Sequence, residues 1–154
     1  MKSSIEAART MGLLVIACLT MVNACFAMVN ACFAEDDATR TVYHLHDGQA
    51  QSTMGMYNIQ NHLKAEPSAQ IIVVANFKGV EAFVFGAQDN FGKPFADWVD
   101  ELSKLGVSFR VCQHSMNSLK IPADQLISNV QVVASGVAEI ARLQSKQKFG
   151  YIRP

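Results

Sequence analysis

The sequence predicts a three-layer α/β/α sandwich of the flavodoxin-like type, with a mainly parallel sheet of five strands. Three observations favour this fold class. Strand-like segments alternate with segments of helical period, and the spacing between them is short. Residues 69–75 (AQIIVVA) form a continuous apolar run, which is typical of a strand buried on both faces of a parallel sheet. Because parallel strands are joined by right-handed crossovers, the alternation indicates helices on both faces of one sheet.

The composition is that of one globular domain. The chain has 154 residues, with 13 Lys and Arg against 13 Asp and Glu. A net charge of zero offers no electrostatic attraction for nucleic acid or an anionic membrane. Neither nucleic acid binding nor stable membrane insertion of the mature chain is therefore predicted.

The N-terminal segment has the anatomy of an export signal. Lys2 and Arg9 supply a weak positive region, and residues 11–20 form an apolar core. Two identical heptads, MVNACFA, follow at residues 21–27 and 28–34. Each heptad ends in Cys-Phe-Ala, which suits signal peptidase because its last residue is small. We interpret this segment as a secretory signal peptide.

Cleavage is predicted after Ala34, where an acidic run begins, with Ala27 as the second choice. Residues 1–34 would then be removed, and residues 35–154 would form one α/β domain that is periplasmic or secreted. Two alternatives stay open. The apolar segment is long enough to remain as a membrane anchor. The residues that end at Cys18 also loosely resemble a lipoprotein signal.

Cleavage would leave one cysteine. Cys18, Cys25 and Cys32 lie in the predicted leader, so only Cys112 would survive. An exported chain with one cysteine has no internal disulfide. Its thiol is then buried and inert, intermolecular or reactive.

The first half of the predicted domain holds two strands and a helix. Residues 41–47 (TVYHLHD) alternate in a strand pattern that Gly48 ends. Residues 51–64 are predicted to be a helix, because their larger apolar side chains recur at helical spacing. These side chains are Met54, Tyr57, Ile59 and Leu63. The buried strand at residues 69–75 comes next.

The middle of the chain is predicted to hold a second helix. Residues 80–85 (VEAFVF) are interpreted as a short strand or a packed turn, and residues 86–93 as a loop in which Phe91 joins the core or a subunit interface. Pro94 suits the first turn of a helix, and Gly106 suits its end. The side chains predicted to be buried by this helix are Phe95, Trp98, Val99, Leu102 and Leu105.

The next strand, at residues 107–112, carries the remaining cysteine. Its alternation places Arg110 and Cys112 on one face. A short helix or turn is predicted at residues 113–119, and another around residues 123–128.

The C-terminal part is predicted to complete the sheet. Residues 130–134 are interpreted as a final core strand, Ser135 as a helix N-cap, residues 136–146 as the last helix and residues 150–154 as an edge strand. The inward side chains of the last helix are predicted to be Val137, Ile140, Ala141 and Leu143.

Functional side chains are expected at the C-terminal ends of the strands, where parallel α/β sheets gather catalytic groups. Cys112, Asp47 and Asn76 lie at such ends. A thiolate at Cys112 would be favoured by the backbone amides of the following helix, and by positive charge from Arg110 or His114. The alternative is that Cys112 is a small buried hydrophobe and His114 an exposed loop residue.

His44 and His46 lie two residues apart and share a strand face. With Cys112 they suggest a metal or small-molecule site, but no spacing signature of a metal site is present. No phosphate-binding glycine pattern occurs either, so no cofactor is predicted.

Several different short motifs follow one another along residues 35–154. They are Tyr43-His44-Leu45, residues 58–63 (NIQNHL), residues 71–75 (IIVVA), residues 102–112 (LSKLGVSFRVC), Ala134-Ser135-Gly136-Val137, Arg142-Leu143-Gln144 and Gly150-Tyr151-Ile152. With a cysteine closing a strand after Leu-x-x-Leu-Gly-Val, this order resembles the DsrE/DsrF-like family of sulfur-relay proteins. The resemblance covers nearly all of the predicted mature chain.

The resemblance implies a three-layer fold that assembles into trimers or hexamers. It also implies that the strand-end cysteine, here Cys112, accepts a sulfane sulfur as a persulfide and passes it on. The implied partners are sulfur donor and acceptor proteins or small sulfane-sulfur compounds. The leading hypothesis is thus an exported sulfur carrier or sulfurtransferase-type relay protein. A non-catalytic oligomeric binding or scaffold protein of the same fold is the alternative, beside the metal or small-molecule module.

Overall fold

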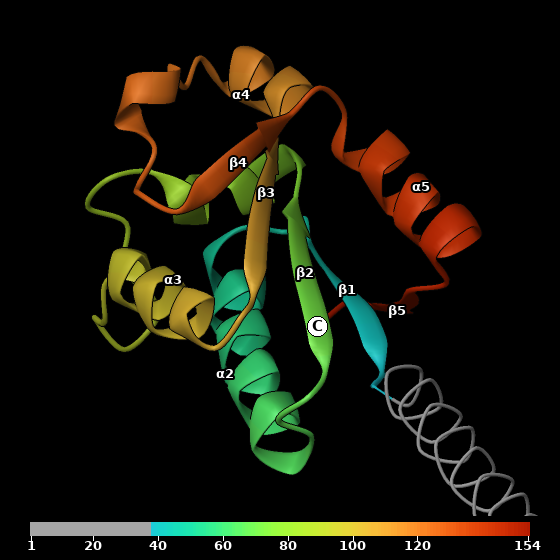
Figure 1. Ribbon diagram of the computed structural model, residues 1–154. Helices are drawn as coiled ribbons and strands as arrows, with labels where there is room; N and C mark the ends of the chain where they lie inside the picture. Colours follow the sequence, from blue (N-terminus) through green and yellow to red (C-terminus); the bar gives the residue numbers. More distant parts are fainter. Residues whose placement is uncertain (1–37) are drawn as a thin grey trace, which may run out of the picture. The chain divides into compact units, whose positions relative to one another are not determined.

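The structure, a computed structural model, describes residues 38–154, so the predicted signal peptide and its cleavage site lie outside the described residues. The described chain forms one five-stranded sheet. Its strands are β1 (Arg40–Leu45), β2 (Gln70–Ala75), β3 (Ser108–Cys112), β4 (Val130–Val133) and β5 (Gly150–Ile152). They lie in the order β4-β3-β2-β1-β5, and each neighbouring pair is parallel (Figure 1). The predicted sheet is confirmed.

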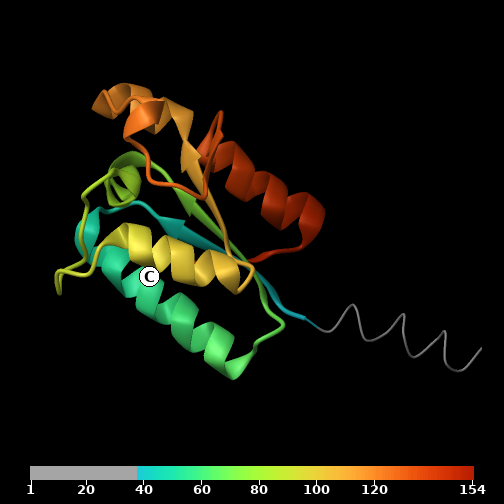
Figure 2. The same cartoon turned by 60° about the vertical axis from the view of Figure 1, so that its left-hand side comes forward.

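Helices cover both faces of this sheet. The helical segments are α2 (Gln49–Ala65), the 3₁₀ helix η1 (Phe77–Phe83), α3 (Phe95–Lys104), α4 (Gln113–Leu119), the 3₁₀ turn η2 (Ala123–Gln125) and α5 (Gly136–Gln147). Figure 2 shows α2 and α3 side by side on one face and α5 on the other. The three-layer α/β/α fold is therefore confirmed.

The register of the strands aligns three chain segments at one edge of the sheet. Leu45 of β1 pairs with Ala75 of β2, and Ala75 pairs in turn with Val111 of β3. The residues one step further lie at the same level: His46 and Asn76 follow β1 and β2, and Cys112 is the last residue of β3. Because side chains alternate along a strand, all three emerge on the α5 side of the sheet.

The two faces of the sheet bury very different amounts of apolar surface. The α2–α3 face carries the main core, whose largest fully buried side chains include Phe83, Phe95, Phe109 and Met56. The α5 face carries a small cluster of Val42, Ile72, Val74, Ile140, Leu143 and Phe149. The α5 face therefore has room for polar side chains at the strand ends.

Strand β4 is not a core strand, so the prediction for residues 130–134 is wrong on this point. The strand pairs only with β3 and ends the sheet. Its two central residues, Gln131 and Val132, are exposed. An edge strand has one neighbour instead of two, and its side chains receive correspondingly less cover.

Two helices bury fewer residues than predicted. In α5, Ile140 and Leu143 are buried, but Val137 is 65% exposed and Ala141 is exposed. The helix packs through one narrow stripe at helical spacing, so residues beside the stripe face solvent. Leu105 is 60% exposed because α3 ends one residue before it.

The segment at residues 80–85 is a packed turn and not a full strand. Most of it belongs to η1, and Val84 makes a single antiparallel bridge to Leu126. Among the helices of residues 38–154, none combines the length and the apolar character needed to cross a membrane.

Candidate functional site

Cys112 lies at the carboxyl edge of the sheet, where β3 passes directly into α4. Its side chain is 4% exposed. The first residue of α5, Gly136, packs against it. A Cβ placed on Gly136 would lie 3.2 Å from the Cβ of Cys112 and 3.1 Å from the Cβ of Asn76. The glycine therefore lets α5 begin directly beside the thiol.

Hydrogen bonds lower the pKa of the Cys112 thiol below its ordinary value. Burial is the largest single influence and raises this pKa, because it disfavours the charged thiolate. The Ser115 hydroxyl and the backbone amides of Gly136, Ser115 and His114 act in the opposite direction and outweigh burial. These amides belong to the first turns of α4 and α5, where backbone N–H groups have no partner within their helix.

Ser115 connects the thiol to the end of β2. Its Oγ accepts a hydrogen bond from the backbone N–H of Phe77 at 2.7 Å. Since that bond uses an oxygen lone pair, the hydroxyl proton remains available to the sulfur of Cys112. The sequence alone does not assign Ser115 to the site, because its contact with the sulfur depends on how the first turn of α4 folds.

Arg110 lies on the same strand face as Cys112, as predicted, but its guanidinium is engaged with α5. It donates to Glu139, which also accepts from Arg142 at 2.7 and 3.1 Å. Hydrogen bonds from Arg142, and then from Arg110, hold the pKa of Glu139 below its ordinary value despite burial. The Glu139 carboxylate thus balances the charge of Arg110, and a direct role of Arg110 in supporting the thiolate stays a prediction.

His114 contributes to the thiol environment through its backbone. Its amide donates toward the sulfur of Cys112, whereas its side chain is exposed. A role of the His114 imidazole in proton transfer therefore stays a prediction.

Asn76 joins the two histidines of β1. Its side chain is buried, and its Oδ1 lies 2.9 Å from Nε2 of His44 and 2.7 Å from Nδ1 of His46. A carboxamide oxygen only accepts hydrogen bonds, so both imidazole nitrogens carry protons. Nδ1 of His44 then accepts from the hydroxyl of Tyr151 at 2.6 Å. Burial lowers the pKa of His44, which keeps its imidazole neutral.

An exposed aromatic ring borders this polar group. Phe77 follows Asn76, has a positive φ of 46° and is 54% exposed. Its ring stacks on His46, with centroids 5.1 Å apart. Just after β1, Asp47 forms an ion pair with Arg153, in which Nη2 of Arg153 donates to both carboxylate oxygens at 2.8 and 2.9 Å. Asp47 thereby anchors the end of the chain and lies outside the thiol environment described above.

The histidines are not arranged as metal ligands. Three of their four ring nitrogens take part in the hydrogen bonds to Asn76 and Tyr151. Within residues 38–154, no group of three or more His, Cys, Asp and Glu side chains is placed to hold a metal ion.

The arrangement at Cys112 suits a nucleophile. A sulfur that accepts several hydrogen bonds from neutral donors is stabilised as a thiolate without a nearby cation. The thiolate is the form that attacks another sulfur atom.

Comparisons with known proteins show which family and which fold this chain shares. The family model of the DsrE/DsrF-like family matches residues 6–149. A solved structure of a protein of unknown function, MTH1491 from Methanobacterium thermoautotrophicum, is similar with 30% sequence identity and a TM-score of 0.66. The likeness covers 75% of this chain and 99% of that one.

A second solved structure shares the fold at lower identity. The YchN protein from E. coli is 13% identical, with a TM-score of 0.59, over 74% of this chain and 96% of that chain. No curated protein matched the chain. The family match spans most of the chain, and the likeness to MTH1491 covers almost the full length of that protein. This protein therefore belongs to the DsrE/DsrF-like family.

Proposed function

We propose that this protein is an exported sulfur carrier that holds a sulfane sulfur as a persulfide on Cys112. The observation that carries the proposal is the position of the Cys112 thiol directly before α4 and beside Gly136, where the Ser115 hydroxyl and three backbone amides lower its pKa. The family supplies the class of chemistry, since DsrE/DsrF-like membership suggests a role in sulfur relay.

The transfer runs in two balanced steps. The Cys112 thiolate attacks the outer sulfur of a donor persulfide, so a Cys112–sulfur bond forms and the donor leaves as a thiolate. An acceptor thiolate then attacks the outer sulfur on Cys112, takes it as a persulfide and releases the Cys112 thiolate. The amides of His114, Ser115 and Gly136 remain beside the sulfur throughout and compensate its negative charge.

Sulfur loading provides the test. The purified protein is incubated with inorganic polysulfide, and the peptide that contains Cys112 is analysed by mass spectrometry without reduction. We expect this peptide to gain the mass of one sulfur atom and to lose it again to an added thiol acceptor. Cys112→Ser should gain nothing. An unmodified Cys112 peptide in the wild-type protein would contradict the proposal.

Ser115→Ala distinguishes a tuned thiolate from a cysteine that merely fills space. Loss of the Ser115 hydroxyl should raise the pKa of Cys112, and the loading rate near neutral pH should fall. Ser118→Ala is the matched control, because its Oγ donates only to the backbone carbonyl of His114 at 2.9 Å. Equal loading rates in both variants would show that the hydroxyl does not stabilise the thiolate.

A non-catalytic binding protein of the same fold is the second candidate, and the 4% exposure of Cys112 favours it. In that case the thiol is a packing group. Its alkylation would then require unfolding, and its rate would follow global stability. A relay requires alkylation of the folded protein.

The proposal includes export and self-association. Residues 1–34 would be the signal peptide, so intact protein recovered from the periplasm should begin at Glu35; a mass that retains Met1 would refute cleavage. Trimers or hexamers are the proposed assembly. Sedimentation as a monomer at high concentration would refute that part.

A further inference from the structure

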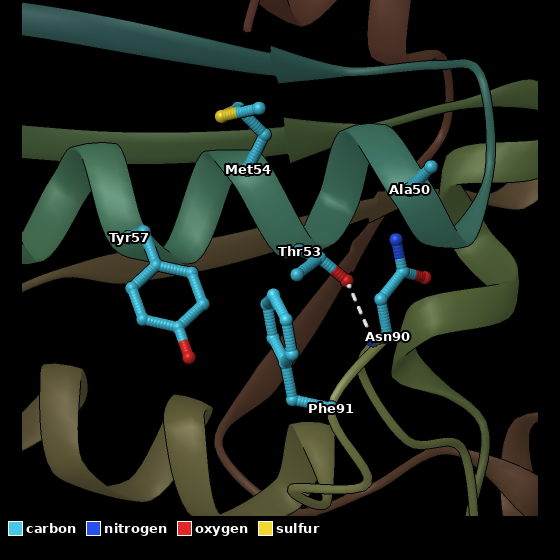
Figure 3. A pocket seen from close by; sticks show the side chains of 6 residues that line it. All are labelled: Ala50, Thr53, Met54, Tyr57, Asn90 and Phe91. Carbon is cyan, nitrogen blue, oxygen red and sulfur yellow. Dashed lines mark hydrogen bonds between the residues drawn. The ribbon is translucent and has the colours of Figure 1, made fainter.

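A pocket of about 440 Å³ lies between α2 and the loop before α3. It is on the face of the sheet opposite to the one from which Cys112 projects. It is lined by Ala50, Thr53, Met54, Tyr57, Asn90 and Phe91. Figure 3 shows the ring of Phe91 projecting from the loop toward α2, between Tyr57 and Thr53. The pocket is thus formed by two segments that β2 and η1 separate in the sequence.

The walls of this pocket are apolar, exposed and uncharged. Phe91 is 78% exposed, Met54 is 56% exposed and Tyr57 is 37% exposed. None of the six lining residues is charged. Exposed apolar side chains that converge on a concave site indicate ligand binding more strongly than single exposed residues do. Phe91 was expected in the core or at a subunit interface, but its ring is largely exposed to solvent.

The loop that carries Phe91 is held in place by a buried carboxylate. Asp89 accepts hydrogen bonds from the backbone N–H of Phe91 at 2.8 Å and of Lys93 at 2.9 Å, and from Nε1 of Trp98 at 3.0 Å. The three hydrogen bonds, with the Lys93 charge, lower the pKa of Asp89 although burial, the largest influence, raises it. The carboxylate therefore stays ionised and keeps the backbone of Phe91 fixed.

A second contact fixes the loop to α2. The backbone N–H of Asn90 donates to Oγ1 of Thr53 at 3.1 Å (Figure 3). That hydroxyl donates in turn to the carbonyl of Gln49 at 2.9 Å. The side chain of Asn90 is exposed and makes no hydrogen bond within residues 38–154. The pocket is accordingly preformed, with one carboxamide at its border able to donate and accept.

We propose that this pocket binds a small uncharged molecule with an aromatic or alicyclic body and one hydroxyl, carbonyl or amide group directed at Asn90. The volume lies within the range of small-ligand pockets. The uncharged lining offers no counter-charge, which disfavours an ionised ligand. Tyr57 and Phe91 form perpendicular walls, with ring centroids 5.9 Å apart and an interplanar angle of 88°, so a planar ring stacks on one and meets the edge of the other.

The single tryptophan of the chain provides a direct readout. The ring of Trp98 lies behind Tyr57, with centroids 4.9 Å apart. The probe is N-phenyl-1-naphthylamine, a neutral aromatic compound that fluoresces in apolar sites. We expect saturable binding of one probe per chain, with energy transfer from Trp98 to the bound probe. Binding without such transfer would place the probe elsewhere and overturn the proposal.

Two exposed side chains allow substitution without loss of the fold. Phe91→Ser and Met54→Gln should each weaken the probe Kd about tenfold or more, because each removes a large apolar contact. Val137→Ser is the matched control, since the exposure of Val137 lies between those of Phe91 and Met54 and the residue is on α5, outside the pocket. Its Kd should equal that of the wild type. Equal affinities in all four proteins would overturn the assignment.

Self-association is the other occupant that the experiment detects. If the wild type binds no probe, and Phe91→Ser lowers the oligomeric state in sedimentation, the patch is an interface between copies of this chain and the ligand proposal is wrong. Because the pocket and the Cys112 side chain lie on opposite faces of the sheet, sulfur loading of Cys112 should be unchanged in Phe91→Ser. Failure of either proposal therefore leaves the other standing.

Discussion

Replacing Gly136 with alanine tests whether the close contact between α5 and Cys112 constrains both stability and thiol chemistry. A Cβ at this position would lie 3.1 Å from the Cβ of Asn76, 3.2 Å from the Cβ of Cys112 and 3.5 Å from Cγ1 of Val74. The two shorter contacts involve Cβ atoms that are fixed by the backbone, so rotation of a side chain relieves neither. The first turn of α5 must instead move outward by a few tenths of an ångström.

The expected magnitude follows from two opposing effects. Overpacking of this kind costs about 2 kcal/mol. Alanine is favoured over glycine in a helix by about 1 kcal/mol, which offsets part of that cost. The net destabilisation is about 1 kcal/mol, which lowers Tm by about 4 °C in a domain of this size. The shift also moves the amide of Gly136 away from the sulfur, so the pKa of the Cys112 thiol should rise.

Two assays measure these effects in the same protein. Urea unfolding gives the change in unfolding free energy, and the pH dependence of iodoacetamide alkylation at Cys112 gives the direction of the pKa change. Gly150→Ala is the control, because its Cβ would meet the carbonyl of Arg40 at an ordinary 3.5 Å. A Gly136→Ala protein with wild-type stability and a wild-type alkylation profile would refute the reasoning.

Three further predictions concern the packing around the site and the pocket. Glu139→Gln leaves the guanidinium of Arg110 without its carboxylate and should cost about 2 kcal/mol in urea unfolding at neutral pH. Because the folded-state pKa of Glu139 lies below its ordinary 4.5, this contribution is present above pH 4.5 and disappears as the pH falls below it, so the two proteins should converge in stability at acid pH. Asp89→Asn replaces one oxygen of a buried carboxylate that accepts three hydrogen bonds with an NH₂ group, so at least one donor loses its acceptor; the change should cost about 2 kcal/mol and alter Trp98 emission. Gly79→Ala drives a Cβ into the last carbonyl of β1 and should prevent folding to a soluble domain, as judged by expression and circular dichroism.

Controls for the first two variants come from exposed positions. Glu101→Gln breaks an exposed pair and should change the unfolding free energy by less than about 1 kcal/mol. Asp124→Asn is the exposed counterpart of Asp89→Asn. A Glu139→Gln protein whose stability deficit persists unchanged at acid pH would contradict the ion-pair argument, and a folded Gly79→Ala protein would contradict the clash.

The order of strands along the chain and the faces of most strand residues followed from periodicity. The run at residues 71–75 is buried throughout in the structure, and the alternation at residues 107–112 places Phe109 in the main core and Cys112 on the opposite face. These features depend on neighbours in the sequence. A repeat of two residues assigns faces wherever a strand forms.

The exposure of side chains on β4 and α5 did not follow from periodicity. Val132 and Val137 are as apolar as buried valines elsewhere, yet both face solvent. Their burial depends on what lies beside β4 and α5, and β4 is at the edge of the sheet. Strand order is a long-range property that hydrophobic pattern alone leaves open.

The candidate site also combines features that follow from local sequence with features that depend on tertiary packing. The sequence by itself determined that Cys112 ends a strand, that a helix follows it and that His44 and His46 share a face. Only the tertiary structure decided which groups surround the sulfur, because Gly136 reaches it from a helix 24 positions along the chain. The same packing directed Arg110 to Glu139 and both histidines to Asn76. The reason is physical: local spacing sets the direction of a side chain, whereas its partners are set by which elements pack together.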